Sequence, residues 1–404
     1  MVPLPLANIL HYRLRSVLSA LGIGIAICML LTLSGLARGT LHEVADRWEA
    51  VDADLIVFPR GWGDSASARS GNGLWDSCAK LIRERHAGVV ERVVPVFTWQ
   101  IRLGGQDQMV AGVDADQWHV LTGGRKLSSG RLFDPDGRFA RWIEKELLTG
   151  GGTDDAPAPR ERLDLARAPH PGLEIVIDSR LARAGGYRVG HSVRAANHEW
   201  KIVGIVPHGA MTRVFMPRRT AQYLFGGSIQ QSTLMFVKVR PGCDVGPAAR
   251  SIAQAISQDV VPLASYRGML RAKFGIMFHY VDAANAVALV IAFLFIMVTL
   301  YTMVLQRMRD IAILKSSGAS DWFIVRQVLG ESALLTVGGT VAGVALACAT
   351  GWAIETFKPL YTVTITWRWI GIAVCAAAVG AGASAVYPAW QATRVDIAEA
   401  LTLE

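Results

Sequence analysis

The stretch that decides the fold is residues 283–306, AANAVALVIAFLFIMVTLYTMVLQ, in which 24 consecutive residues carry no Asp, Glu, Lys or Arg. A helix of this length crosses the hydrocarbon core of a bilayer at about 1.5 Å per residue. Three similar charge-free runs cover residues 16–37, 332–354 and 369–393. The sequence therefore predicts an α-helical membrane protein with four transmembrane helices, and excludes a soluble enzyme as the main interpretation.

The composition agrees with this prediction. Of the 404 residues, 51% are hydrophobic and only 18% are charged, against about 25% charged in an ordinary soluble domain. Residues 220–237 also lack charge, but Gly226, Ser228 and Gln230 would place polar groups without partners at the centre of a bilayer. We therefore expect this run to be a turn between two elements of a folded domain.

The distribution of basic residues predicts the topology. Seven lie in the tails 1–15 and 394–404 or in the loop 307–331, and two lie in the short loop 355–368. Because basic residues concentrate on the cytoplasmic side, both termini and the 307–331 loop are predicted to be cytoplasmic, and residues 38–282 extracytoplasmic. The run 16–37 is longer than the apolar core of a signal peptide, about 7–15 residues, so we expect a permanent span.

Residues 38–282 predict a large α+β extracytoplasmic domain. Alternating apolar patterns predict strands at 54–59, 93–103, 108–113, 234–239 and 260–263, and helical patterns cover 74–85 and 245–258. Between the two groups, residues of about 116–230 contain strands at 173–177 and 199–206 and a poorly ordered loop at 150–159. The expected architecture is a two-part α+β subdomain with an inserted β-rich subdomain. The sequence does not decide whether Cys78 and Cys243 form a disulfide.

Two amphipathic patterns connect this domain to the spans. Apolar residues recur at steps of three and four in 41–51 and in 266–281. The two segments could pair as a stalk that holds the domain away from the bilayer. They could also lie flat among the headgroups, because the same periodicity permits interfacial helices.

The loop 307–331, RMRDIAILKSSGASDWFIVRQVLGE, is the most informative stretch. Gly318 suits the left-handed position after a helix. Ser320 can then cap a second helix, with Asp321 in its first turn and Trp322 and Phe323 as apolar side chains. We expect a short amphipathic helix that either contacts a soluble partner or lies in the interface.

Two motifs carry a resemblance to a known family. Residues 309–315, RDIAILK, with Gly318, Ala319 and Glu331, resemble the "REIAILKALGA…E" signature of permease subunits of the MacB/FtsX superfamily of ABC transporters, the type VII mechanotransmission class. The ending YPAWQATRVDIAEAL at 387–401 is similar to the family's "YPAWRAARLDPAEAL". The family pattern often has Arg and Pro where this chain has Gln391 and Ile397.

The resemblance implies a permease in the bacterial cytoplasmic (inner) membrane that works as a dimer, with a second copy or a homologue. A separate cytoplasmic ATPase would bind ATP and Mg²⁺ and move the extracytoplasmic domain, thereby exporting or extracting an amphiphile such as a lipid, lipoprotein, peptide or drug. A periplasmic adaptor and membrane lipid are further partners that it allows. The residues that it assigns to ATPase coupling are Arg309, Asp310, Lys315, Gly318, Ala319, Asp321, Trp322, Phe323 and Glu331. The alternative is an FtsX-like signalling protein that activates an extracytoplasmic partner such as a cell-wall hydrolase.

The residues themselves add constraints on function. The printed sequence has no Gly-x-x-x-x-Gly-Lys-Ser/Thr loop, so we expect a permease subunit without its own ATPase motif, no cofactor bound by this chain, and no catalytic or metal site. No span contains an ionisable acid or base for an ion relay. Gly339 and Gly343, and the Ala/Gly-rich stretch 376–384, are expected to allow close helix packing. Nucleic-acid binding is excluded for a domain outside the membrane.

Overall fold

The computed structural model describes residues 13–61, 73–133, 141–142, 145, 173–226, 228–306 and 308–393. The chain divides into two compact units. The first, the membrane unit, combines Met1–Thr40 with Phe274–Glu404, and the second, the outer unit, is Leu41–Lys273. The expected poorly ordered loop at 150–159 lies outside the described residues. Each unit is described by itself.

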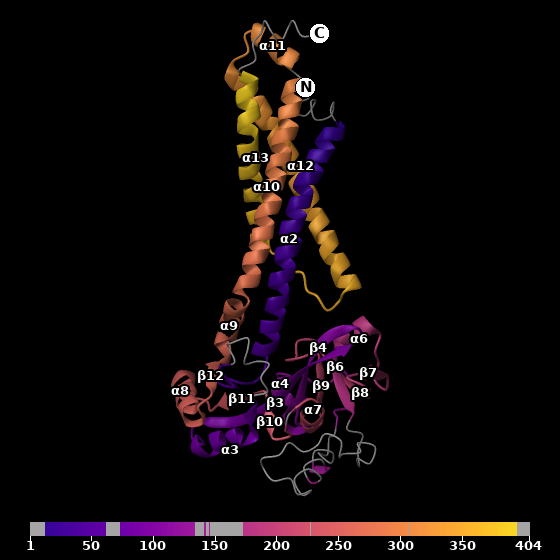
Figure 1. Ribbon diagram of the computed structural model, residues 1–404, viewed down its shortest axis with the longest axis vertical. Coiled ribbons are helices and arrows are strands. Elements are labelled where there is room, and N and C mark those ends of the chain that lie inside the picture. Colours follow the sequence, from indigo (N-terminus) through magenta and orange to yellow (C-terminus); the bar gives the residue numbers. More distant parts are fainter. Residues whose placement is uncertain are drawn as a thin grey trace. The chain divides into compact units, whose positions relative to one another are not determined.

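The membrane unit is built from helices (Figure 1). They are α2 (Arg13–Glu49, whose last turns belong to the outer unit), α10 (Gly275–Gln306), α11 (Met308–Ser316), α12 (Asp321–Phe357) and α13 (Trp367–Thr393). Within the described residues, α2, α10, α12 and α13 are long and apolar enough to cross a membrane. The four predicted spans are therefore confirmed as helices.

The helices of the membrane unit pack through small and aliphatic side chains. Buried residues of all four spans form one cluster, with Ile27, Leu300 and Leu335 among its members. At Gly343 of α12 a Cβ atom would lie 2.7 Å from the carbonyl oxygen of Gly24 in α2, so the expected close approach is present. In the stretch 376–384, by contrast, the buried residues are alanines and a serine, whereas Gly380 and Gly382 face open space.

In the outer unit, the two predicted α+β segments come together in one sheet. Their elements are β1 (Leu55–Phe58), α3 (Asp76–Arg85) and β3 (Val90–Leu103), followed much later by β11 (Leu234–Val239), α8 (Val245–Ile256) and β12 (Asp259–Pro262). The strands lie in the order β12-β1-β11-β3 with antiparallel pairing. This is a β-α-β-β-α-β arrangement whose halves come from distant parts of the chain.

The insertion extends the same sheet. It contributes β4 (Gln106–Val113), β5 (Ser129–Gly130), β6 (Glu174–Asp178), β7 (Ser192–Ala195), β8 (His198–Val206) and β9 (Val214–Pro217), with helices α4 (Trp118–Leu121), α6 (Ser179–Gly185) and α7 (Arg218–Phe225). The 14-residue strand β3 pairs with β11 through its first half and with β4 through its second. The expected fold class is thus confirmed, and the two subdomains share a sheet of ten strands in the described part.

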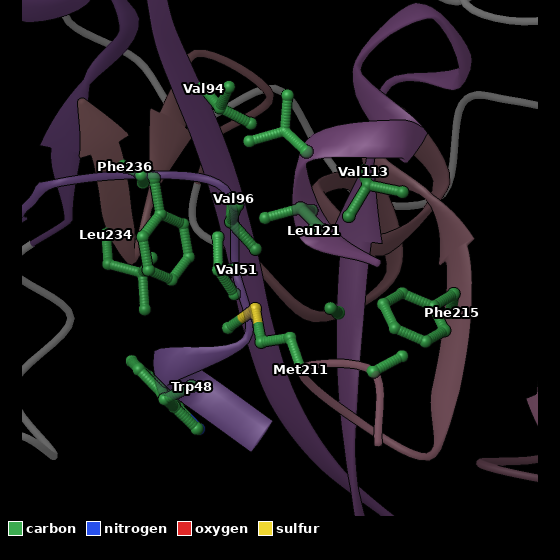
Figure 2. Packing of buried hydrophobic residues seen from close by; sticks show 14 of the residues in the cluster. Trp48, Val51, Val94, Val96, Val113, Leu121, Met211, Phe215, Leu234 and Phe236 are labelled. Carbon is green, nitrogen blue, oxygen red and sulfur yellow. The ribbon is translucent and has the colours of Figure 1, made fainter. Parts of the chain in front are cut away.

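The core of the outer unit lies where the end of α2 meets both parts of this sheet (Figure 2). Trp48 and Val51 at the α2 end pack in one cluster with Val96 of β3, Phe215 of β9 and Phe236 of β11. The helix end and the sheet therefore share a single hydrophobic core. Such a shared core resists independent movement of its parts, because protein interiors are close-packed.

Two further predictions concern particular residues. The charge-free run 220–237 forms the end of α7, the short strand β10 (Gln231–Ser232) and the start of β11 in the outer unit, as expected for two elements joined by a turn. The possible disulfide is absent, since Cys78 and Cys243 are both free thiols. Burial raises the pKa of the Cys78 thiol, which makes it less reactive.

Candidate functional site

The first candidate site is the turn between α11 and α12, which we name the coupling turn and define as residues 315–323. Helix α11 ends at Ser316, and Gly318 takes a left-handed backbone conformation with φ of 90°. Its N–H donates to the carbonyl of Lys315 at 3.0 Å. Ser320 then caps α12 by accepting a hydrogen bond from the N–H of Phe323 at 3.3 Å. The expected glycine stop and serine start are therefore both present.

The coupling turn exposes two aromatic side chains beside an ion pair. Trp322 is 70% exposed and Phe323 is 47% exposed. Lys315 and Asp321 form an ion pair across the turn, with 3.2 Å between Nζ and Oδ1. Exposed aromatic residues at the end of a rigid helix are typical anchors for a partner protein.

The structure brings together only part of the predicted set. Lys315, Gly318, Ala319, Asp321, Trp322 and Phe323 lie within the coupling turn, whereas the side chains of Arg309 and Asp310 lie outside the described residues. Glu331 is buried at 5% exposure in α12. Because it follows Asp321 by ten residues in the same helix, it lies about 15 Å from Asp321 along the helix axis. Glu331 is therefore not part of the exposed surface of the turn.

One difference from the sequence prediction concerns the second helix. The helix that begins after Ser320 is not separate from the third span, because α12 runs unbroken from Asp321 to Phe357. Its first turns pack through Ile324 and Val328 against Val304 of α10 and Ala389 of α13. The sequence offers no proline within α12, and Gly330 alone does not end a helix that packs on its neighbours. A force on Trp322 therefore acts directly on a span.

The second candidate site, at the outer end of α2, was not found from the sequence. We name it the Glu43 cluster: Glu43, Arg47, Asp178, Arg180 and Arg213. The Glu43 carboxylate accepts hydrogen bonds from three arginines, Arg47 at 2.8 Å and Arg180 and Arg213 at 2.9 Å each. Arg47 also donates to Asp178 Oδ2 at 3.1 Å. Since Arg180 and Arg213 belong to the insertion, the cluster joins α2 to it.

Asp178 is the carboxylate that the insertion contributes to the Glu43 cluster. It ends β6 and caps α6, because its Oδ1 accepts a hydrogen bond from the N–H of Leu181 at 2.6 Å. Its complete burial acts to raise its pKa. The His208 side chain at 3.7 Å, the hydrogen bond from the N–H of Leu181 and the charges of Arg47 and Arg213 outweigh burial and hold the pKa below its ordinary value. Asp178 and Ser179 thus form the junction between β6 and α6.

The opposite side of the α2 end contacts α9 (Tyr266–Lys273). The rings of Trp48 and Tyr266 stack with centroids 4.6 Å apart and an interplanar angle of 12°. Arg267 forms ion pairs with Asp46 at 2.6 Å and Glu49 at 2.7 Å. Residues of the two amphipathic segments, at the end of α2 and in α9, are therefore paired within the outer unit.

The two sites offer different kinds of surface. Among the described residues, no group of three or more His, Cys, Asp and Glu side chains is placed to hold a metal ion. The coupling turn offers an exposed apolar surface, and the Glu43 cluster offers satisfied ion pairs. The coupling turn can therefore bind a partner, and the Glu43 cluster can hold the end of α2 against the insertion.

Two family models match the chain. A model described as the MacB-like periplasmic core domain matches residues 16–255, which is more than half of the chain. A second, described as the FtsX-like permease C-terminal domain, matches residues 283–397. Together they cover the four spans, the coupling turn and the sheet of the outer unit apart from β12.

Curated relatives show the same likeness over the whole chain. The macrolide export ATP-binding/permease protein MacB of Bradyrhizobium diazoefficiens is 23% identical over 99% of this chain, and that of Paracoccus denitrificans is 24% identical over 96%. The chain spans 59% and 56% of the lengths of these relatives. A crystal structure of the periplasmic region of MacB from Actinobacillus actinomycetemcomitans is 15% identical, with a TM-score of 0.39, and the match covers 55% of this chain and 94% of that one.

Proposed function

This chain belongs to the MacB/FtsX family of ABC-transporter permeases, and from that premise we propose that it converts ATP-driven movement in the cytoplasm into movement of its periplasmic domain. The work done outside would be the export or extraction of an amphiphile, such as a lipid, a lipoprotein, a peptide or a drug. No passage through the centre of the spans is needed for this mechanism, since the movement itself acts on the substrate.

The proposal rests on one observation, the length and packing of α2 and α12. Helix α2 is one helix of 37 residues that contributes Ile27 to the core of the membrane unit and Trp48 to the core of the outer unit. Helix α12 is equally long and begins in the coupling turn, where Trp322 is exposed. Long unbroken helices that pack into such cores transmit displacement, because packed cores do not deform continuously.

We further propose that a cytoplasmic ATPase docks on the coupling turn and supplies the bound ATP and Mg²⁺. The names of the relatives combine ATP binding with a permease, and the printed sequence has no phosphate-binding loop of the usual pattern. The exposed rings of Trp322 and Phe323 would fill apolar pockets of this partner, with the ion pair of Lys315 and Asp321 at the rim. A second permease copy or homologue and a periplasmic adaptor complete the proposed assembly.

The test changes exposed side chains of the proposed docking surface and leaves buried side chains as they are. The variants Trp322→Asp and Phe323→Asp are expressed as the full chain in native membranes, purified into nanodiscs, and assayed for bound ATPase and for ATP hydrolysis. Loss of a central aromatic anchor costs about 2 kcal/mol or more, so we expect at least about a tenfold loss of bound ATPase.

The matched control is Trp75→Asp, because Trp75 is 47% exposed like Phe323 but lies in the outer unit. It should bind the ATPase normally. If Trp322→Asp and Phe323→Asp both retain the ATPase and its stimulated hydrolysis, the coupling turn is not the docking surface. Recovery of a cell-wall hydrolase with the wild-type chain would instead favour the signalling alternative.

A further inference from the structure

Three of the charge-free runs have a polar or aromatic residue at the same end, and the structure brings these residues together. Arg38 directly follows the run of α2, Asp282 directly precedes that of α10, and Trp369 opens that of α13. Arg38 Nη2 donates to Asp282 Oδ1 at 3.2 Å. The guanidinium carbon of Arg38 lies 4.4 Å from the ring centroid of Trp369 and 5.3 Å from that of Phe278. One side chain of α2 thus contacts both α10 and α13.

A second polar contact lies one turn further into the bundle. Asn285 Nδ2 donates to Ser34 Oγ at 2.9 Å. Ser34 is fully buried and Asn285 is 7% exposed. Because Ser34 and Arg38 are four residues apart on α2, and Asp282 and Asn285 three apart on α10, both contacts lie on the same helix faces. They are two side-chain contacts between α2 and α10, one helical turn apart.

The other side of this segment of α2 is also held. The N–H of Thr364, in the loop before α13, donates to the carbonyl of Gly35 at 3.2 Å. A Cβ atom at Gly39 would lie 2.5 Å from the carbonyl oxygen of Thr362, so only glycine permits this approach. Residues 34–39 of α2 therefore contact α10 and α13 through polar and charged side chains, and the loop through backbone.

We propose that these residues form a clamp that makes the ends of α2, α10 and α13 move as one body; we name it the Arg38 clamp and define it as Ser34, Arg38, Phe278, Asp282, Asn285 and Trp369. Apolar contacts alone leave helices in a bilayer free to slide, because lipid tails are as apolar as leucine side chains. A directional ion pair, a cation–π contact and a buried hydrogen bond each specify one register.

The role of the clamp follows from which segments it joins. Helices α2 and α10 are the two through which the chain enters and leaves the outer unit, and the clamp lies on both. This role rests on the proposed transmission function. The Arg38 clamp ensures that movement of α2 or α10 moves the other helix as well. Without it the two crossings would move independently, and the displacement that reaches the outer unit would be reduced.

The experiment measures the clamp directly. Spin labels are placed at Met29 of α2 and Ala286 of α10, which are both exposed, in a full chain whose native cysteines are replaced. Distance distributions in nanodiscs are compared for the parent, Arg38→Gln and Arg38→Lys. Arg38→Gln removes the ion pair and the cation–π contact together, so it should raise the population of separated helices about tenfold. Arg38→Lys should be intermediate, because it keeps the charge but loses the planar stacking.

The exchanged variant, Arg38→Asp with Asp282→Arg, separates a specific pair from a general loss of folding. It should restore part of the parent distance distribution, whereas Asp282→Arg alone should not. Unchanged distances in Arg38→Gln, or no rescue by exchange, would overturn the clamp. These distances need no ATPase, so they can fail while ATPase docking on Trp322 is intact, and they can hold even if that docking proposal fails.

Discussion

The outer end of α2 depends on one buried carboxylate, and its removal gives the most informative prediction. Glu43 is 9% exposed and accepts hydrogen bonds from Arg47, Arg180 and Arg213. The variant Glu43→Gln keeps the size and shape of the side chain but removes its charge. Arg47, whose side chain is 7% exposed, then keeps only Asp178 as an ionic partner within the Glu43 cluster.

The expected loss of stability follows from this burial. Removal of one partner from a buried ion pair costs about 3–5 kcal/mol, because the remaining charge stays buried without full compensation. Arg180 and Arg213 are more exposed, at 24% and 18% of their side chains, and water replaces part of what they lose. For a unit of the size of Leu41–Lys273, each kcal/mol lowers the Tm by about 2–4 °C. We expect a fall of about 10 °C.

The assay is thermal unfolding of the full chain in nanodiscs, followed by tryptophan fluorescence. The matched control is Glu84→Gln, since Glu84 is 62% exposed and pairs with Lys80 at 3.9 Å. An exposed pair of this kind contributes at most about 0.5 kcal/mol, so its loss should shift the Tm by no more than about 2 °C. Equal shifts for Glu43→Gln and Glu84→Gln would refute the view that the Glu43 cluster joins α2 to the insertion.

Three further predictions follow from packing, charge and capping. Gly343→Val should separate α12 from Gly24 of α2 and reduce thermal stability by about 1–3 kcal/mol, whereas Gly380→Ala, at a helical position that faces open space, should not lower the Tm. Because the pKa of Asp178 lies below its ordinary value of 3.8, its stabilisation is complete above that pH and is lost as pH falls through the lower folded-state pKa; Asp178→Asn should therefore flatten the decrease of Tm measured on acidification below about pH 4. Ser320→Ala removes the cap of α12, about 1 kcal/mol, and should speed hydrogen exchange of the first-turn amides about fivefold; unchanged exchange would contradict the capping role.

Much of the fold could be predicted because its signals are local. A span is a run of contiguous apolar residues, and the strands 234–239 and 199–206 alternate over a few positions, so each was located close to its observed bounds. The turn at Gly318 and Ser320 was predicted for the same reason, since capping depends on neighbouring residues.

The candidate sites show which contacts local sequence patterns do not predict. The pattern of 307–331 predicted the exposed aromatic residues of the coupling turn, but Glu331 was grouped with them by motif, although its burial in α12 removes it from that surface. The spacing of Glu43 and Arg47 at four residues was a visible ion-pair signal, yet nothing near them in sequence indicated Asp178, which is 131 residues away. The same holds for Arg38 and Asp282, separated by 244 residues.

The sequence by itself determined that the chain has four spanning helices, a large α+β domain after the first, and a capped turn between the second and third, because these depend on the hydrophobic pattern and on local backbone chemistry. Only the tertiary structure decided that β3 serves both parts of one sheet, that three arginines surround Glu43, and that Arg38 lies between two aromatic rings. The physical reason is that a buried charge is stable only where distant segments supply its partners, and the choice among many arginines and carboxylates is made by packing of the whole chain.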